Sequence, residues 1–204
     1  MAPLAPDSRT RALSPWRHLP NVISMLRIAL VAPVIVAIEA RSFHLALILA
    51  VVAGVSDGLD GWLARHFHWR SRLGSVLDPV ADKLLLVACF VVLTHMGKVP
   101  VGLTALVLGR DLIIAVGAWA WHRVIGHFRS SPSWISKCCT AMQILYVLAV
   151  LVGEAGWLRL PMAPWIWLVA ALTLASGLDY IVRWGWMAHR ELAQRRRSRG
   201  RDES

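Results

Sequence analysis

The sequence predicts an all-α integral membrane protein, a bundle of six transmembrane helices. Apolar residues make up 57% of the 204 residues and charged residues only 17%, which is too apolar for an ordinary soluble surface. Apolar side chains recur with helical spacing in six stretches, each close to the ~20 residues that cross the hydrocarbon core of a bilayer. These stretches are 21–39, 43–65, 74–97, 99–122, 134–154 and 161–187.

Polar segments flank this membrane region. We expect a cytoplasmic polar or amphipathic arm over residues 1–19, a membrane domain over 20–188 and a basic cytoplasmic tail over 189–204. Residues 9–18 are equally compatible with a short interfacial helix and with a disordered arm. The arm lacks the apolar core of a signal peptide, so we expect no cleaved signal.

The charge distribution predicts the orientation in the membrane. The formal net charge is +10, but the basic residues flank apolar runs, which favours anionic lipid headgroups over nucleic acid. With six spans, fifteen Lys and Arg fall on the side of both termini, against Arg41, Lys98 and Arg159 on the other side. The positive-inside rule then places both termini and the acidic stretch described below in the cytoplasm. We expect a multi-pass protein of a bacterial inner membrane.

Charged residues, tryptophans and cysteines also occur in the apolar stretches. Charges at lipid depth are costly, so we expect them to line a shared polar cavity. They are Arg27, Lys83, Arg110, Asp111 and Lys137. The eleven tryptophans cluster near the ends of the stretches, as in an interfacial belt. Cys89, Cys138 and Cys139 show no metal-binding spacing, and we expect small buried hydrophobes.

Four aspartates lie at helical spacing where the second and third apolar stretches meet: Asp57, Asp60, Asp78 and Asp82. Converging carboxylates repel one another unless cations neutralise them. Oxygen donors without His or Cys select Mg²⁺, Mn²⁺ or Ca²⁺ over softer metals. Such a cluster usually holds two divalent ions for an in-line displacement at phosphorus.

The rest of these two helical faces is small or cationic. Gly58, Gly61, Ala64 and Gly74 allow a bulky ligand to approach the backbone, and Arg65 offers a fork for phosphate oxygens. A metal-lined slot that faces lipid implies a lipid substrate activated as a diphosphate. The alternative is a structural helix hairpin held by Asp–Arg pairs.

Eight of these positions form a pattern with fixed spacing, Asp-x2-Asp-Gly-x2-Ala-Arg-x8-Gly-x3-Asp-x3-Asp, complete from Asp57 to Asp82. This pattern resembles the signature of the CDP-alcohol phosphatidyltransferases, integral membrane enzymes of phospholipid synthesis. The sequence Pro20-Asn21-x-Ile23-Ser24-x2-Arg27 with Pro33 is similar to the first-helix motif of that family. The resemblance extends over residues 20 to 185.

The resemblance implies a six-helix bundle, usually a homodimer, that transfers a phosphatidyl group from CDP-diacylglycerol to an alcohol and releases CMP. It implies two divalent ions, Mg²⁺ or Mn²⁺, held by the four aspartates. Asp78 and Asp82 are the catalytic candidates, with Asp82 also the general base. The candidates for binding the cytidine diphosphate are Gly61, Ala64, Arg65, Gly74 and Asn21.

The later stretches indicate the acceptor alcohol. Arg110-Asp111 and the Ser-Lys-x2-Thr-x2-Gln run around Lys137 resemble the glycerol-type branch of the family, so Arg110 and Lys137 are the candidates for binding the acceptor. Enzymes that use glycerol 3-phosphate typically carry a second lysine and a further arginine, where this chain has Cys139 and Ala118.

The likeness is therefore greater to the CMP-forming cardiolipin synthases, which use phosphatidylglycerol. Phosphatidylglycerophosphate synthase is the alternative. An ion-coupled transporter and a non-catalytic membrane scaffold are the remaining classes, but neither needs an Ala-Arg pair and two glycines at these spacings.

Overall fold

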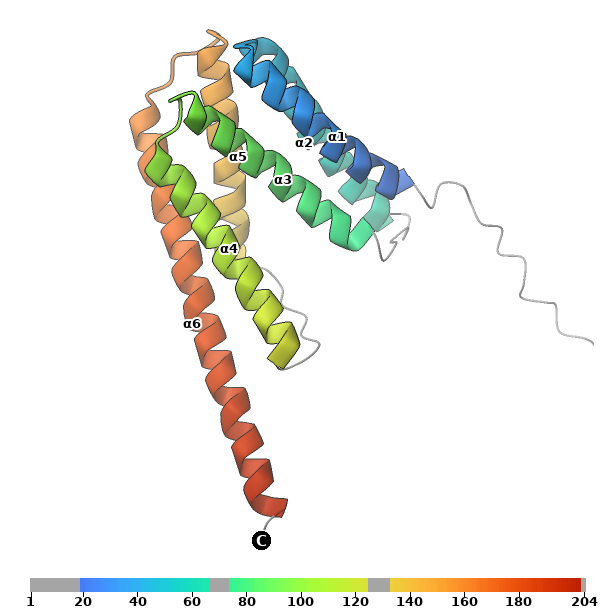
Figure 1. Cartoon of the computed structure of the whole chain (residues 1–204), viewed down its shortest axis with the longest axis vertical. Helices are drawn as coiled ribbons and strands as arrows, with labels where there is room; N and C mark the ends of the chain where they lie inside the picture. Colours follow the sequence, from blue (N-terminus) through green and yellow to red (C-terminus); the bar gives the residue numbers. More distant parts are fainter. Residues whose placement is uncertain (1–18, 67–73, 125–132, 203–204) are drawn as a thin grey trace, which may run out of the picture. The chain divides into compact units, whose positions relative to one another are not determined.

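The computed structural model describes residues 19–66, 74–124 and 133–202, with side chains over 25–56, 83–120, 123 and 133–186. Within these ranges the chain is helical and has no strand (Figure 1). The helices are α1 (Leu19–Glu39), α2 (Phe43–His66), α3 (Gly74–His95), α4 (Val101–Val124), α5 (Trp134–Glu154) and α6 (Met162–Asp202). The predicted all-α class is confirmed. Residues 9–18, for which an interfacial helix and a disordered arm are equally compatible with the sequence, lie outside the described residues.

Three described helices are long and apolar enough to cross a membrane: Val101–Ala120, Trp134–Glu154 and Met162–Trp186. Two shorter apolar helical segments, Phe43–Ser56 and Lys83–His95, lie in α2 and α3. Length and composition therefore support a membrane protein through α4, α5 and α6. The six crossings of the bilayer stay a prediction.

The first compact unit contains α1, α2 and the first part of α3, as far as Ala88. A turn over 40–42 joins α1 to α2, and Arg41 takes a positive φ of 56° there. The two helices pack side by side through a row of buried residues on each (Figure 1). The buried row is Arg27, Val31, Val34 and Ile38 on α1, and Phe43, Ala46, Leu47 and Ala53 on α2. Pro33 lies inside α1 without ending it.

Residues 89–204 form the second unit, in which α6 packs against both α4 and α5. Its core contains the Phe90 and Tyr146 rings, stacked with centroids 6.1 Å apart. Val107, Leu151 and Val169 are also fully or nearly fully buried. An ion pair ties the connection between α3 and α4 to the end of α5, since Lys98 Nζ lies 2.5 Å from Glu154 Oε2.

Helix α6 is longer than the sequence pattern predicts. It continues as far as Asp202, through most of the expected basic tail. Residues 187–202 contain no proline and a single glycine, Gly200; they are rich in Arg and also contain Ala, Glu, Leu and Gln. These are strong helix formers, so the helix propagates beyond the apolar span.

Two expectations about side-chain burial are corrected. Cys89 and Cys139 are buried, but Cys138 is exposed. Adjacent residues of a helix lie about 100° apart around its axis, so only one of the pair on α5 meets the core. Lys137 is exposed as well, and its Nζ lies 5.1 Å from the centroid of the Trp134 ring. Exposed tryptophans near ends of helices, such as Trp119 and Trp157, fit the predicted interfacial belt.

The contact between α4 and α6 depends on a glycine. A Cβ atom at Gly117 would lie 2.9 Å from Tyr180 Oη and 3.0 Å from its Cε1. Tyr180 has little freedom to move, because its hydroxyl donates to the Ile114 carbonyl at 3.0 Å and its ring stacks on Trp184 with centroids 4.9 Å apart. The absence of a side chain at Gly117 therefore makes room for this ring.

We predict that Gly117→Ala destabilises the protein by about 1–3 kcal/mol, the usual cost of overpacking a well-packed contact. Gly109→Ala on the same helix is the matched control, since its Cβ would meet no atom within 4 Å. The control should be neutral or slightly stabilising, because alanine favours a helix over glycine. Thermal unfolding in detergent measures both. Equal midpoints for the two variants would contradict the role given to Gly117.

Candidate active site

The eight signature positions lie at the adjoining ends of α2 and α3. Asp57, Asp60, Gly61, Ala64 and Arg65 fall in the last ten residues of α2, which ends at His66. Gly74, Asp78 and Asp82 fall in the first nine residues of α3. Seven residues separate the two helices. The predicted helical spacing of the signature is confirmed, and all eight positions belong to the first unit.

Helical spacing of three and four residues connects the signature positions to buried residues of the same helices. On α2, positions 57, 60 and 64 continue the row of Ala46 and Ala53, which are fully buried, in steps of three and four residues. On α3, position 82 is followed at the same spacing by buried Leu86 and Cys89. The helical register therefore places the signature in line with these buried residues. The signature's own side chains, and Asn21, lie outside the described side chains, so their roles stay predictions.

Arg27, which the sequence analysis expects in a polar cavity but gives no role in the site, is a further site candidate. Its side chain is 2% exposed and begins the buried row of α1. From the helical rise, Arg27 lies about 18 Å before the end of α1, and Asp57 about 21 Å after the start of α2. Because a tight turn joins these two packed helices, Arg27 and Asp57 lie at a similar level. The available signal was an arginine in an apolar helix, which is costly at lipid depth.

The donor set of the signature fits hard divalent cations. It offers four carboxylates on two neighbouring helix ends and neither His nor Cys, which suits Mg²⁺ or Mn²⁺. Three of its other positions, Gly61, Ala64 and Gly74, carry no bulky side chain that would fill the space beside the ions. Elsewhere, the described side chains include no group of three His, Cys, Asp or Glu that could hold a metal.

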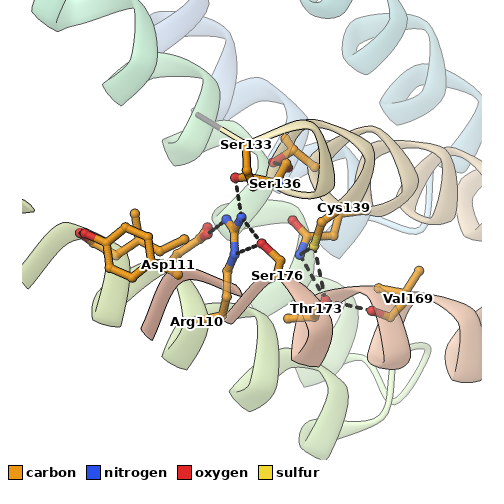
Figure 2. Close-up of polar contacts among 12 residues, drawn as sticks. Arg110, Asp111, Ser133, Ser136, Cys139, Val169, Thr173 and Ser176 are labelled. Carbon is orange, nitrogen blue, oxygen red and sulfur yellow. Dashed lines mark hydrogen bonds and ion pairs between the residues drawn. The ribbon is translucent and has the colours of Figure 1, made fainter. Parts of the chain in front are cut away.

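In the second unit, Arg110 joins α4 to α5 and α6 (Figure 2). Its guanidinium is buried and donates to Ser176 Oγ on α6 from Nε at 3.1 Å and from Nη2 at 2.6 Å. Nη2 also donates to Ser136 Oγ on α5 at 2.5 Å, and Nη1 to Asp111 Oδ1 at 2.7 Å. Three helices and one carboxylate thus fix this arginine in place.

The second acceptor candidate has different surroundings. Lys137 follows Ser136, the α5 partner of Arg110, and both lie in the first turn of α5. Ser133 caps this helix end by accepting from the Ser136 N–H at 3.2 Å. The structure therefore brings the two predicted positions to the same junction of α4 and α5. Their side chains differ, however: Arg110 is buried and ion-paired, whereas Lys137 is exposed beside Trp134.

A neutral polar cluster lies next along α5 and α6. Gln143 Nε2 donates to Cys139 Sγ and to Thr173 Oγ1, both at 3.3 Å, and Thr173 Oγ1 donates to the Val169 carbonyl at 2.7 Å (Figure 2). Gln143, Cys139 and Thr173 are fully buried. The neutral side chain of Cys139 is therefore enclosed by buried neighbours, Gln143 and Thr173. The sequence analysis did not single out Thr173 or Ser176; the available signal was small hydroxyl residues one turn apart in an apolar span.

The sequence model for the CDP-alcohol phosphatidyltransferase family matches residues 17–178. A human cardiolipin synthase (CMP-forming) is 38% identical over 155 residues, which cover 68% of this chain and 51% of that protein. A Streptomyces coelicolor cardiolipin synthase (CMP-forming) is 32% identical over 178 residues, 81% of either chain. A Haemophilus influenzae CDP-diacylglycerol–glycerol-3-phosphate 3-phosphatidyltransferase is 29% identical over 170 residues, 80% of this chain and 91% of that protein.

The chain spans about half the length of the human relative. The matched range contains the whole signature on α2 and α3 and the buried Arg110–Asp111 pair on α4. A match over most of the chain, together with relatives above 30% identity, establishes the family. This chain belongs to the CDP-alcohol phosphatidyltransferase family.

Proposed function

We propose that this protein transfers the phosphatidyl group from CDP-diacylglycerol to the hydroxyl of a glycerol-type acceptor and releases CMP. We propose phosphatidylglycerol as the acceptor and cardiolipin as the product. The observation that carries the reaction is the complete eight-position signature at the adjoining ends of α2 and α3. The names of the relatives, which include both cardiolipin synthases and a glycerol-3-phosphate phosphatidyltransferase, support a glycerol-type acceptor.

In this proposal the first unit binds the activated lipid. Asp57, Asp60, Asp78 and Asp82 hold two divalent ions, Mg²⁺ or Mn²⁺, which supply positive charge for the diphosphate and the leaving phosphate. Arg65 binds phosphate oxygens through its guanidinium fork. Gly61, Ala64 and Gly74 leave room for the cytidine diphosphate, and Asn21 contributes from α1.

The chemical step is a displacement at phosphorus. Asp82 accepts the proton of the acceptor hydroxyl. The acceptor oxygen forms a bond to the phosphorus that carries diacylglycerol, and the bond from that phosphorus to the oxygen bridging it to the cytidylate phosphorus breaks. CMP leaves with that oxygen, and the new lipid is a phosphodiester of the acceptor. Alignment of the two substrates by fixed residues supplies much of the rate.

We predict that chelation with EDTA abolishes CMP release and that added Mg²⁺ or Mn²⁺ restores it.

Asp78→Asn, which is nearly isosteric, should lower the rate at least ~100-fold, because the lost carboxylate weakens the binding of the ions that stabilise the developing charge. Asp179→Asn is the control: this carboxylate pairs with Arg183 on α6 at 2.7 Å and lies outside the signature. CMP release from purified protein measures the effect of chelation and the rates of both variants. Normal turnover in Asp78→Asn would remove Asp78 from the site, and no CMP release by the unmodified protein would favour a transporter.

We propose phosphatidylglycerol as the acceptor because of the charges around the acceptor candidates in the second unit. Arg110 is paired with Asp111, and Cys139 lies in a neutral cluster. Lys137 lies over the Trp134 ring and pairs with no carboxylate of the described part of the chain, so of the two acceptor candidates it is the one that keeps its charge. Glycerol 3-phosphate is a free dianion at neutral pH and needs local positive charge. Phosphatidylglycerol carries a single negative charge at the membrane surface and presents an uncharged glycerol, so this environment suits it better.

We predict that purified protein with labelled CDP-diacylglycerol forms cardiolipin and CMP from phosphatidylglycerol, and that glycerol 3-phosphate is a poor acceptor. The measurement is two parallel incubations, one with each acceptor, resolved by lipid chromatography. Rapid formation of phosphatidylglycerol phosphate without cardiolipin would replace this proposal by the glycerol-3-phosphate phosphatidyltransferase activity.

We further propose six spans, with the arm over 1–19 and the residues after 188 on the cytoplasmic side of a bacterial inner membrane. The support is the excess of Lys and Arg on that side. A protease-cleavable tag at the C-terminus should be cut in inverted membrane vesicles and protected in right-side-out vesicles. The opposite pattern would reverse the topology. The homodimer that the family resemblance implies stays a prediction.

A further inference from the structure

Asp111 occupies a specific place on the Arg110 guanidinium. The Nε–Nη2 edge is held by the Ser176 hydroxyl, and Nη2 also donates to Ser136. Asp111 accepts from Nη1, the remaining nitrogen, at 2.7 Å. Four of the five N–H groups of an arginine are thereby used. The one remaining N–H belongs to Nη1, the nitrogen that already donates to Asp111.

The partners of Arg110 differ in charge. The two serine hydroxyls accept hydrogen bonds but leave the positive charge uncancelled. The Asp111 carboxylate cancels it, in a pair whose side chains are only 4% and 14% exposed. An ion pair removed from water is weakly screened by salt, so this cancellation persists under cellular conditions. Arg110 and Asp111 together therefore present a dipole with no net charge.

We propose that Asp111 determines the acceptor specificity, by neutralising Arg110 and so discriminating against free phosphate monoester dianions. The acceptor that remains favoured is the uncharged glycerol hydroxyl of a lipid phosphodiester. This inference rests on the function proposed above. Asp111 acts through Arg110 and is a positioning residue, with no direct contact to the reacting atoms required.

The physical reason is charge repulsion at one nitrogen. Ser176 and Ser136 hold the guanidinium in place, so a phosphate dianion can bind Arg110 only through the N–H that remains on Nη1, directly beside the Asp111 carboxylate. Two anions close together in a largely buried place repel each other strongly. A neutral hydroxyl meets no such repulsion and can bind beside the intact pair.

The test is Asp111→Asn, which keeps the shape of the side chain and an oxygen that accepts from Nη1 but removes the charge. We expect the KM for glycerol 3-phosphate to fall about tenfold or more, equivalent to ~1.4 kcal/mol. The ratio of kcat/KM for glycerol 3-phosphate to that for phosphatidylglycerol should rise. Asp111→Glu, which retains the charge, should keep the ratio of the unmodified enzyme.

Asp179→Asn is the matched control, because it also removes a carboxylate bonded to an arginine, Arg183, within the second unit. Its ratio should equal that of the unmodified enzyme. The double variant Arg110→Gln with Asp111→Asn should show no gain over Arg110→Gln alone, because Asp111 acts through Arg110. A purely structural role for Asp111 would lower both acceptor activities and leave their ratio unchanged, and that result would overturn the inference.

A competition assay covers the case in which Asp111→Asn does not fold. In the unmodified enzyme, glycerol 3-phosphate should fail to compete with phosphatidylglycerol. Competitive inhibition would show that a dianion binds beside the intact pair and would overturn the inference. Failure of the proposed function looks different: the unmodified enzyme would release no CMP with either acceptor.

Discussion

Charges placed within apolar helices of this chain must be compensated, since a lone charge at lipid depth costs several kcal/mol. The second unit meets this constraint at Arg110, where Asp111 supplies the opposite charge and hydroxyls from α5 and α6 accept the remaining hydrogen bonds. In the first unit, Arg27 is buried in α1 at a level similar to Asp57. Each of these arginines is enclosed by the packed helices of its own unit.

The same constraint gives the two units different chemistry. The signature places four carboxylates on two helix ends, an excess of negative charge that is suited to divalent ions. Around Arg110 the charges balance within the protein itself, and the neighbouring Cys139, Gln143 and Thr173 are neutral. A centre that holds cations suits a diphosphate, and a balanced centre suits an acceptor with an uncharged hydroxyl. The proposed substrates follow from this difference.

Small residues allow the helices to come close enough for these contacts. Gly117 admits the Tyr180 ring against α4, and Ser176 lies near enough to bond two nitrogens of Arg110. Such residues are the usual means of packing helices in membranes, where lipid tails are as apolar as leucine and burial of apolar surface gives little association. Outside these contacts, large apolar side chains such as Leu112, Ile113 and Val116 on α4 are exposed, as a lipid environment permits.

Local periodicity determined the helices, because an apolar repeat of 3.6 residues and a length near that of a bilayer are both written in the sequence. The spacing of the signature likewise determined its place on α2 and α3. Tertiary structure alone decided which side chains meet. Ser136 and Ser176 lie 26 and 66 residues from Arg110, so no local pattern connects them. Periodicity also left open which of Cys138 and Cys139 is buried, and whether α6 ends with its apolar span or continues to Asp202. A repeat gives the face of a helix, but the partner of that face depends on how distant helices pack.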